Sequence, residues 1–97
     1  MLTKPKSFLL VDDDPDYRAF FVNALRNVDG ETKCRTTRNG EEALSTLLNN
    51  KFRPNYIFTG LKMPRMNGFE FIKVIRETEE FRDVPIIVYS SAFSNVE

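Results

Sequence analysis

Apolar and polar positions change their period several times along the chain. Short apolar runs are typical of buried strands, whereas apolar residues three and four positions apart indicate amphipathic helices. The runs predict strands at Ser7–Val11, Lys33–Arg38, Tyr56–Thr59 and Ile86–Ser90, of which the second is the most polar. Helical spacing lies between them and predicts helices from Pro15 to Asp29-Gly30, from Gly40 onward, and from about Phe69 to Thr78. The predicted order is strand and helix three times, followed by a strand.

The helix starts carry recognisable signals. Asp14 can cap the first helix, with Pro15 as its first residue, and Asn39 can cap the second. The periodicity predicts three apolar stripes: Tyr17, Phe20, Phe21, Ala24, Leu25 and Val28; then Ala43, Leu44, Leu47 and Leu48; then Phe69, Ile72, Val74 and Ile75.

Apolar strands that alternate with amphipathic helices predict a parallel sheet covered on both faces. Right-handed crossovers place the carboxyl ends of such strands at one edge, where ligands bind in open sheets of this kind. Three chemically distinct features fall at that edge, namely the acidic run Asp12 to Asp14, the loop from Gly60 to Met63, and the Ser90 hydroxyl.

The acidic run suggests a site for a hard cation. If Asp14 is used as the helix cap, Asp12 and Asp13 remain as oxygen ligands for an ion such as magnesium. The alternative is a solvated acidic turn that ends in a cap. On three aspartates alone, this alternative is the simpler interpretation.

Composition narrows the class of protein. The 97 residues predict one domain, residues 1–97, and 14 basic residues balance 14 acidic ones, which gives no electrostatic footprint for nucleic acid. A lone cysteine, Cys34, and the absence of histidine argue against a disulfide framework, a zinc site and histidine-based catalysis. The first apolar run is too short for a signal peptide or a membrane span. A cytoplasmic protein is expected.

Four segments occur together in a recognisable order: FLLVDDDP, NGEEAL, LKMPRMNG and VPIIVYSS. In order and spacing they resemble the receiver domains of response regulators. The resemblance covers nearly the whole chain and implies a flavodoxin-like, doubly wound parallel sheet. It also implies a magnesium-binding acidic pair, an aspartate that accepts a phosphoryl group from a histidine kinase, and a hydroxyl and a lysine that bind the phosphoryl oxygens.

The resemblance assigns positions in this chain. Asp12 and Asp13 match the acidic pair, Ser90 matches the hydroxyl, and the backbone carbonyl of Lys62 matches a third metal ligand. The position of the phosphorylated aspartate, however, holds Gly60. Glycine has neither a nucleophile nor a carboxylate ligand, so we expect no acyl phosphate and a weak or vacant magnesium site.

Alternatives remain open around this position. Gly60 can also mark a bulge or a close approach of backbone. A surrogate acceptor is disfavoured, because Thr59 faces the other side of the sheet and Ser90 lacks an activating base. The Lys62 ammonium can neutralise Asp12 and Asp13 in place of the cation, or it can be an ordinary solvent-facing lysine.

A second departure concerns the end of the family pattern. The sequence printed here reaches Glu97 without a fifth strand, its lysine or the last helices, so we expect an incomplete receiver with strand order 2-1-3-4. The fourth strand would then be an apolar edge that invites association. The interface candidates are Phe20, Phe21, Leu25, Val88 and Tyr89.

These features favour a non-enzymatic pseudo-receiver that contacts a signalling protein, either a histidine kinase or an output partner, without aspartyl phosphorylation. One alternative is a phosphorylatable regulator with a surrogate acceptor. The other is an assembly or dimerisation module that uses the fourth-strand edge. No membrane or nucleic-acid partner is expected.

Overall fold

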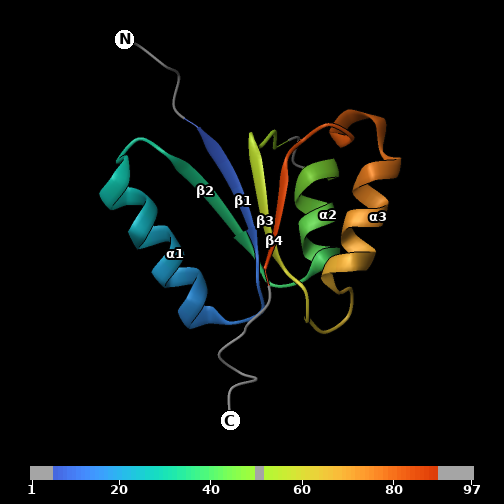
Figure 1. Ribbon diagram of the computed structural model, residues 1–97, viewed down its shortest axis with the longest axis horizontal. Coiled ribbons are helices and arrows are strands. Elements are labelled where there is room, and N and C mark those ends of the chain that lie inside the picture. Colours follow the sequence, from blue (N-terminus) through green and yellow to red (C-terminus); the bar gives the residue numbers. More distant parts are fainter. Residues whose placement is uncertain (1–5, 50–51, 90–97) are drawn as a thin grey trace.

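A four-stranded parallel sheet forms the centre of the molecule (Figure 1). The computed structural model describes residues 6–49 and 52–89. The strands are β1 Ser7–Val11, β2 Lys33–Thr37, β3 Tyr56–Gly60 and β4 Ile86–Tyr89. Their order is β2-β1-β3-β4, and every pairing is parallel. The fold class and strand order predicted from the sequence are therefore confirmed.

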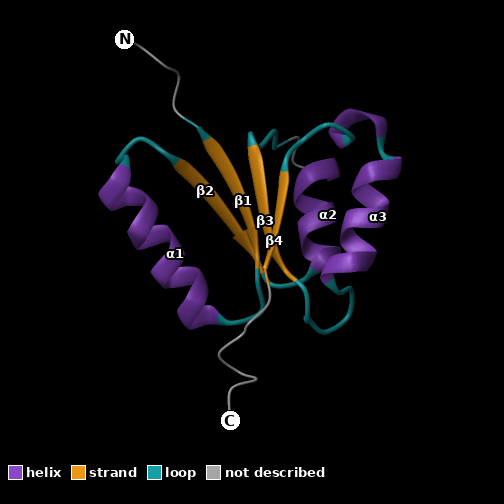
Figure 2. Ribbon diagram, viewed as in Figure 1, coloured by secondary structure: helices purple, strands orange, loops and turns teal. Residues whose placement is uncertain are grey.

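Helices cover both faces of this sheet (Figure 2). Helix α1 (Pro15–Val28) lies on one face, and α2 (Gly40–Asn49) and α3 (Gly68–Glu77) lie side by side on the other. A short 3-10 turn at Glu79–Phe81, which the sequence pattern did not predict, leads into β4. None of the helices in residues 6–49 and 52–89 has the length and apolar character needed to cross a bilayer.

The first two helices start where the capping residues predicted. The Asp14 side chain accepts a hydrogen bond from the backbone N–H of Asp16 at 2.9 Å, and Pro15 is the first helical residue. The Asn39 side chain likewise accepts from the N–H of Glu42 at 2.9 Å. These caps bring both helices in immediately after the strand ends, which keeps the connecting loops at the carboxyl edge short.

The predicted apolar stripe of α3 is partly wrong. Phe69 is 68% exposed, whereas Phe71, which the prediction omitted, is fully buried together with Ile75. Asn67 caps α3 in a reciprocal pair with Glu70, and the helix begins at Gly68, whose close approach to the Gly60 carbonyl oxygen fixes it on the inward face. The inward face therefore runs through Gly68, Phe71 and Ile75 at helical spacing and turns Phe69 to solvent.

One residue of the α2 stripe is also misplaced. Ala43 and Leu47 are buried as predicted, but Leu48 is 48% exposed. Leu48 follows Leu47 by one residue and is thus rotated by about 100° around the helix axis, away from the sheet. Thr46, at 8% exposure, shares the buried face instead.

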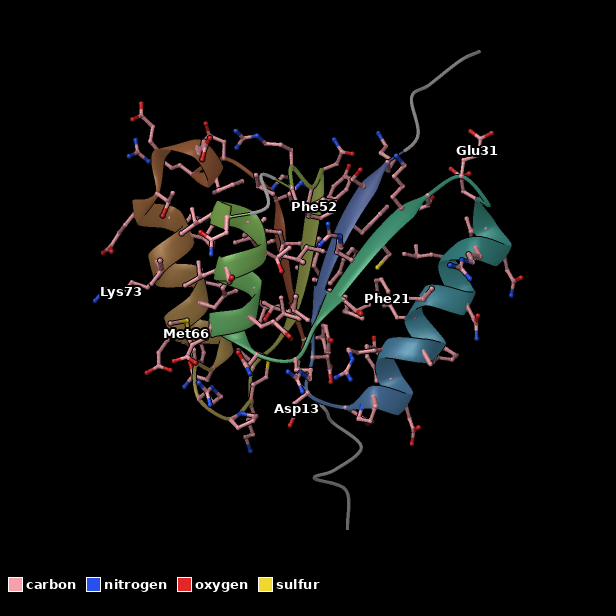
Figure 3. The ribbon with its side chains drawn as sticks, turned by 180° about the vertical axis from the view of Figure 1, so that it is seen from behind. Asp13, Phe21, Glu31, Phe52, Met66 and Lys73 are labelled. Carbon is pink, nitrogen blue, oxygen red and sulfur yellow. The ribbon has the colours of Figure 1, made fainter. Side chains whose placement is uncertain are left out.

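The core lies mainly on the α2 and α3 face of the sheet. It consists of side chains that are almost fully buried: Leu9, Val11, Ala43, Leu47, Ile57, Phe71, Ile75 and Phe81. Helix α1, in contrast, has no buried residue. Its attachment is aromatic: Phe21 points from α1 toward the sheet (Figure 3) and packs edge-on against Phe58 at a centroid distance of 5.0 Å.

Gly68 is the glycine that the backbone packing requires. A methyl group at this position would overlap the carbonyl oxygen of Gly60 and lie 3.0 Å from the Cα atom of Leu61. Both are backbone atoms at the end of β3, so neither can move without disturbing the strand. Gly68 thus allows α3 to begin directly against the carboxyl edge of the sheet.

We predict that Gly68→Ala lowers the free energy of unfolding by about 1–3 kcal/mol through overpacking. Gly30→Ala is the matched control, because an added methyl there meets only one backbone oxygen at 3.9 Å and the φ angle of Gly30 is not positive. The control should leave stability unchanged or raise it slightly. Thermal denaturation of both variants measures this, and equal melting temperatures would contradict the close approach.

The partial burial of Cys34 in β2 leads to a prediction about how stability depends on pH. Desolvation raises the pKa of its thiol to about 11. The unfolded thiol has the lower pKa and releases its proton first, so this group makes the free energy of unfolding fall as pH rises from about 9 to about 11. Denaturation of the protein and of Cys34→Ala across this interval should show a shallower decline for the variant. Parallel declines would contradict the prediction.

Candidate functional site at the carboxyl edge of the sheet

Three elements bring the candidate site together. Asp12 directly follows β1, Gly60 ends β3, and Tyr89 ends β4 opposite Gly60 in the strand register. Asp13 lies at the same end of the sheet (Figure 3). The parallel topology therefore gathers residues separated by up to 77 positions in the chain into one cluster.

The Asp12 carboxylate is the centre of this cluster and is only 6% exposed. Its Oδ1 accepts a hydrogen bond from the backbone N–H of Asp14 at 2.8 Å. Its Oδ2 accepts one from the hydroxyl of Tyr89 at 2.5 Å. The second distance falls in the range of charge-assisted O–H···O⁻ bonds, which are stronger than neutral ones. Both carboxylate oxygens of Asp12 are thus engaged within the protein.

The backbone N–H and carbonyl groups of Asp12 are also hydrogen-bonded. Its N–H donates to the carbonyl oxygen of Thr37 at 3.0 Å, which joins the end of β1 to β2. Its own carbonyl oxygen accepts from Nη1 of Arg18 at 2.7 Å. A guanidinium from the first turns of α1 therefore stands beside the acidic turn, a contact that the sequence pattern did not reveal.

Tyr89 is half-buried and its hydroxyl remains protonated. Burial, the hydrogen bond to Asp12 and the charge of that carboxylate together raise the pKa of Tyr89 well above its ordinary value. Its ring also lies 5.4 Å from that of Tyr17 between centroids. The sequence pattern had suggested an interface role for Tyr89. The structure adds a hydrogen bond to the acidic pair.

Gly60 has room for a side chain at its first atom. A Cβ would stand 3.5 Å from Oδ2 of Asp12 and 3.7 Å from Cε1 of Tyr89, both ordinary contacts. Its φ angle is not positive either. Neither crowding nor backbone conformation therefore requires glycine here, which removes the structural explanation that the sequence had left open.

The neighbouring hydroxyls were the alternative acceptors. Thr59 is fully buried, and its hydroxyl donates to the carbonyl oxygen of Gly60 at 3.0 Å. It thus has no access to the carboxyl edge from solvent. Ser90, the expected phosphoryl-binding hydroxyl, lies outside the described residues.

Lys62 and Asp13 are exposed and border one open pocket of about 570 Å³ at this edge. Within residues 6–49 and 52–89, Lys62 forms no ion pair with Asp12 or Asp13. The Asp12 partner is Tyr89 instead. The hypothesis that the lysine ammonium replaces the cation therefore gains no support from this arrangement.

The residues present do not fit a magnesium ion well. Magnesium requires near-octahedral oxygen coordination. Each Asp12 oxygen already accepts one hydrogen bond, and Gly60 contributes no carboxylate, so the donors left are Asp13, the backbone carbonyl of Lys62 and one further lone pair on each Asp12 oxygen. In the part of the chain that the structure describes, no three Asp, Glu, His or Cys side chains gather closely enough to hold a metal.

The interface candidates differ in exposure. Phe20 on α1 is 65% exposed and Val88 on β4 is 41% exposed. Phe21 and Leu25 are half-buried between α1 and the sheet. Tyr89 is half-buried as well and turns its hydroxyl to the acidic turn.

Comparisons with known proteins agree with this architecture. The family described as "Response regulator receiver domain" matches residues 8–97. The polar-differentiation response regulator DivK of Brucella anthropi is 31% identical, over 90% of this chain and 68% of its own. Several curated relatives are longer, and the chain spans only 22% to 36% of their length.

Solved structures of response regulators also have this fold. The phosphorylated cyanobacterial phytochrome response regulator RcpA superposes with a TM-score of 0.83 at 27% identity, over 91% of this chain and 66% of its own. The Mn²⁺-bound form of response regulator Rcp1 superposes with a TM-score of 0.81 at 25% identity, over 90% of this chain and 66% of its own. Because the family pattern spans nearly the whole sequence and the fold agrees with it, this chain belongs to the response regulator receiver domain family.

Proposed function

We propose that this receiver domain is a pseudo-receiver, which works in two-component signalling by protein–protein contact and without aspartyl phosphorylation. The observation that carries the proposal is Gly60 at the end of β3, where the resemblance places the phosphorylated aspartate. An acyl phosphate forms on a carboxylate oxygen, and glycine offers none. The space beside Gly60 is bordered by Asp12 and the ring of Tyr89.

The surroundings of Gly60 favour the same conclusion. A substitute nucleophile needs solvent access and an activating base. The Thr59 hydroxyl is buried and bonded to a carbonyl oxygen, and the chain contains no histidine. Asp12 is committed to two hydrogen bonds, which leaves its carboxylate poorly placed to act as an acceptor itself.

The partner class follows from the family and from the surface charge. Receiver domains contact histidine kinases and output domains, so the partner we propose is a signalling protein of one of these kinds. The chain carries 14 basic and 14 acidic residues, a balance that disfavours binding to the nucleic-acid backbone. The exposed Asp13 and Lys62 at the carboxyl edge suit a polar protein contact.

We predict that the protein takes up no phosphoryl group from acetyl phosphate in the presence of magnesium. Intact-mass spectrometry and a phosphate-affinity gel should both show only the unmodified chain, because the acceptor position lacks a carboxylate. A phosphorylatable receiver domain treated in parallel is the positive control. A stoichiometric, hydroxylamine-sensitive phosphoryl adduct would contradict the proposal and would point to a surrogate carboxylate.

A second candidate function is assembly through the α1 and β4 side of the sheet. The observation that favours it is the exposure of Ile87 at 40% and Val88 at 41% on β4, together with Phe20 at 65% on α1. Among the described residues β4 is an edge strand of the sheet, and exposed apolar side chains on an edge strand favour association. This candidate is compatible with a pseudo-receiver, since both act through contact.

For this second candidate we predict a dimer at micromolar concentration in sedimentation velocity. Val88→Glu should weaken the dimer by at least about tenfold, or ~1.4 kcal/mol. Val28→Glu is the matched control, because Val28 is 84% exposed at the far end of α1 and should tolerate the charge. A monomeric wild-type protein at high concentration would rule this candidate out and leave the pseudo-receiver proposal intact.

A further inference from the structure

We infer that Tyr89 replaces the metal ion of this site: its hydroxyl occupies Asp12, closes the magnesium position and makes the carboxyl edge independent of divalent cations. The inference goes beyond the proposed function, because it concerns metal binding and holds whether or not a phosphoryl group is ever transferred. It starts from the misfit between the residues present and a magnesium ion.

The Asp12 carboxylate is already hydrogen-bonded within the protein. A carboxylate that is 6% exposed needs partners for its oxygens. In a metal-binding receiver a cation would be one such partner. Here the hydroxyl of Tyr89 donates a hydrogen bond to Oδ2 at 2.5 Å, and the backbone N–H of Asp14 donates one to Oδ1 at 2.8 Å. To coordinate magnesium through Oδ2, Asp12 would have to use the second lone pair of that oxygen beside the Tyr89 hydroxyl, or give up its bond to Tyr89.

A tyrosine hydroxyl donates a hydrogen bond but brings no positive charge. The guanidinium of Arg18 donates to the backbone carbonyl oxygen of Asp12 at 2.7 Å, and within the described residues it forms no ion pair with the carboxylate. The carboxylate is therefore held by two hydrogen bonds, from the Tyr89 hydroxyl and from the N–H of Asp14, while Arg18 holds the backbone of the same residue.

Gly60 lies beside both Asp12 and Tyr89. The Cβ position at Gly60 lies 3.5 Å from Asp12 Oδ2 and 3.7 and 3.9 Å from two ring atoms of Tyr89. An aspartate there would extend its carboxylate into the space beside that ring and that oxygen. Two carboxylates so close repel each other unless a cation lies between them. The glycine and the tyrosine are therefore complementary: absence of the third carboxylate leaves room for the inward ring.

As a consequence, the side chains at the carboxyl edge of the sheet keep one arrangement with or without a divalent cation. Asp12 stays bonded to Tyr89 whether magnesium is present or absent, so cation concentration does not alter this part of the surface. Asp13 remains exposed and available for a protein partner. The surface offered to a partner is then constant, as expected of a contact module rather than a switch.

The experiment measures divalent-ion binding by the whole chain. Magnesium is titrated calorimetrically, and Mn²⁺ is added as a paramagnetic probe while backbone amide signals are followed by NMR. The variants are Tyr89→Phe, Gly60→Asp and the double variant. Tyr56→Phe is the matched control, since it removes a tyrosine hydroxyl at the start of β3, where the ring stacks on Phe8.

The wild-type protein and Tyr56→Phe should show no saturable binding at millimolar magnesium and no selective Mn²⁺ broadening at Asp12 or Asp13. Tyr89→Phe keeps the ring but frees the carboxylate, and should show weak binding that the further change Asp13→Asn abolishes. The double variant should bind at least about tenfold more tightly than Gly60→Asp alone, which is the scale on which hydrogen-bond partners of a metal site act.

Two results would overturn the inference. One is saturable, Asp13-dependent binding of Mn²⁺ by the wild-type protein, which needs no variant and so stands even if a substitution unfolds the domain. The other is equal affinity of Gly60→Asp and the double variant, with circular dichroism showing both folded. Either result would leave the absence of phosphorylation untouched, whereas uptake of a phosphoryl group would refute the pseudo-receiver proposal alone.

Discussion

The hydrogen bond between the Tyr89 hydroxyl and the Asp12 carboxylate organises the whole carboxyl edge. Asp12 is nearly buried where β1 ends, and a buried carboxylate without partners is strongly unfavourable. Its backbone is hydrogen-bonded to Thr37 and Arg18, which fixes the position from which its side chain extends. The bond to Tyr89 ties the end of β1 to the end of β4 across β3, and Gly60 lies directly between them.

The same contacts bear on how this edge packs when Gly60 supplies no carboxylate. In a receiver domain with three carboxylates, a cation holds mutually repelling groups together. Here Gly60 supplies no carboxylate, and the Asp12 carboxylate accepts hydrogen bonds from the Tyr89 hydroxyl and the N–H of Asp14. Asp13 remains exposed to solvent, where water stabilises its charge. The site has become part of the packing of the sheet, joined to the close approach of Gly68 to the Gly60 carbonyl.

Much of the fold could be predicted from local sequence signals, whereas the key contact could not. Asp14 and Asn39 cap their helices as expected, since capping depends on residues three or fewer positions away. Phe69 was misassigned because a tertiary contact, the close approach of Gly68 to the end of β3, sets the inward face of α3. The Tyr89–Asp12 bond joins residues 77 positions apart, and only the strand register places Tyr89 opposite Gly60. The available signal was a tyrosine that ends an otherwise apolar strand.

The most direct test of this account is to observe the Tyr89 hydroxyl proton by NMR in the metal-free protein. A hydroxyl proton shared between two oxygen atoms that lie 2.5 Å apart exchanges slowly with water and resonates far downfield. We expect such a signal, unchanged by added magnesium, and we expect Asp12→Asn to shift it strongly upfield or abolish it. A Tyr89 hydroxyl that exchanges rapidly in the folded wild-type protein, or one whose signal disappears when magnesium is added, would contradict the account.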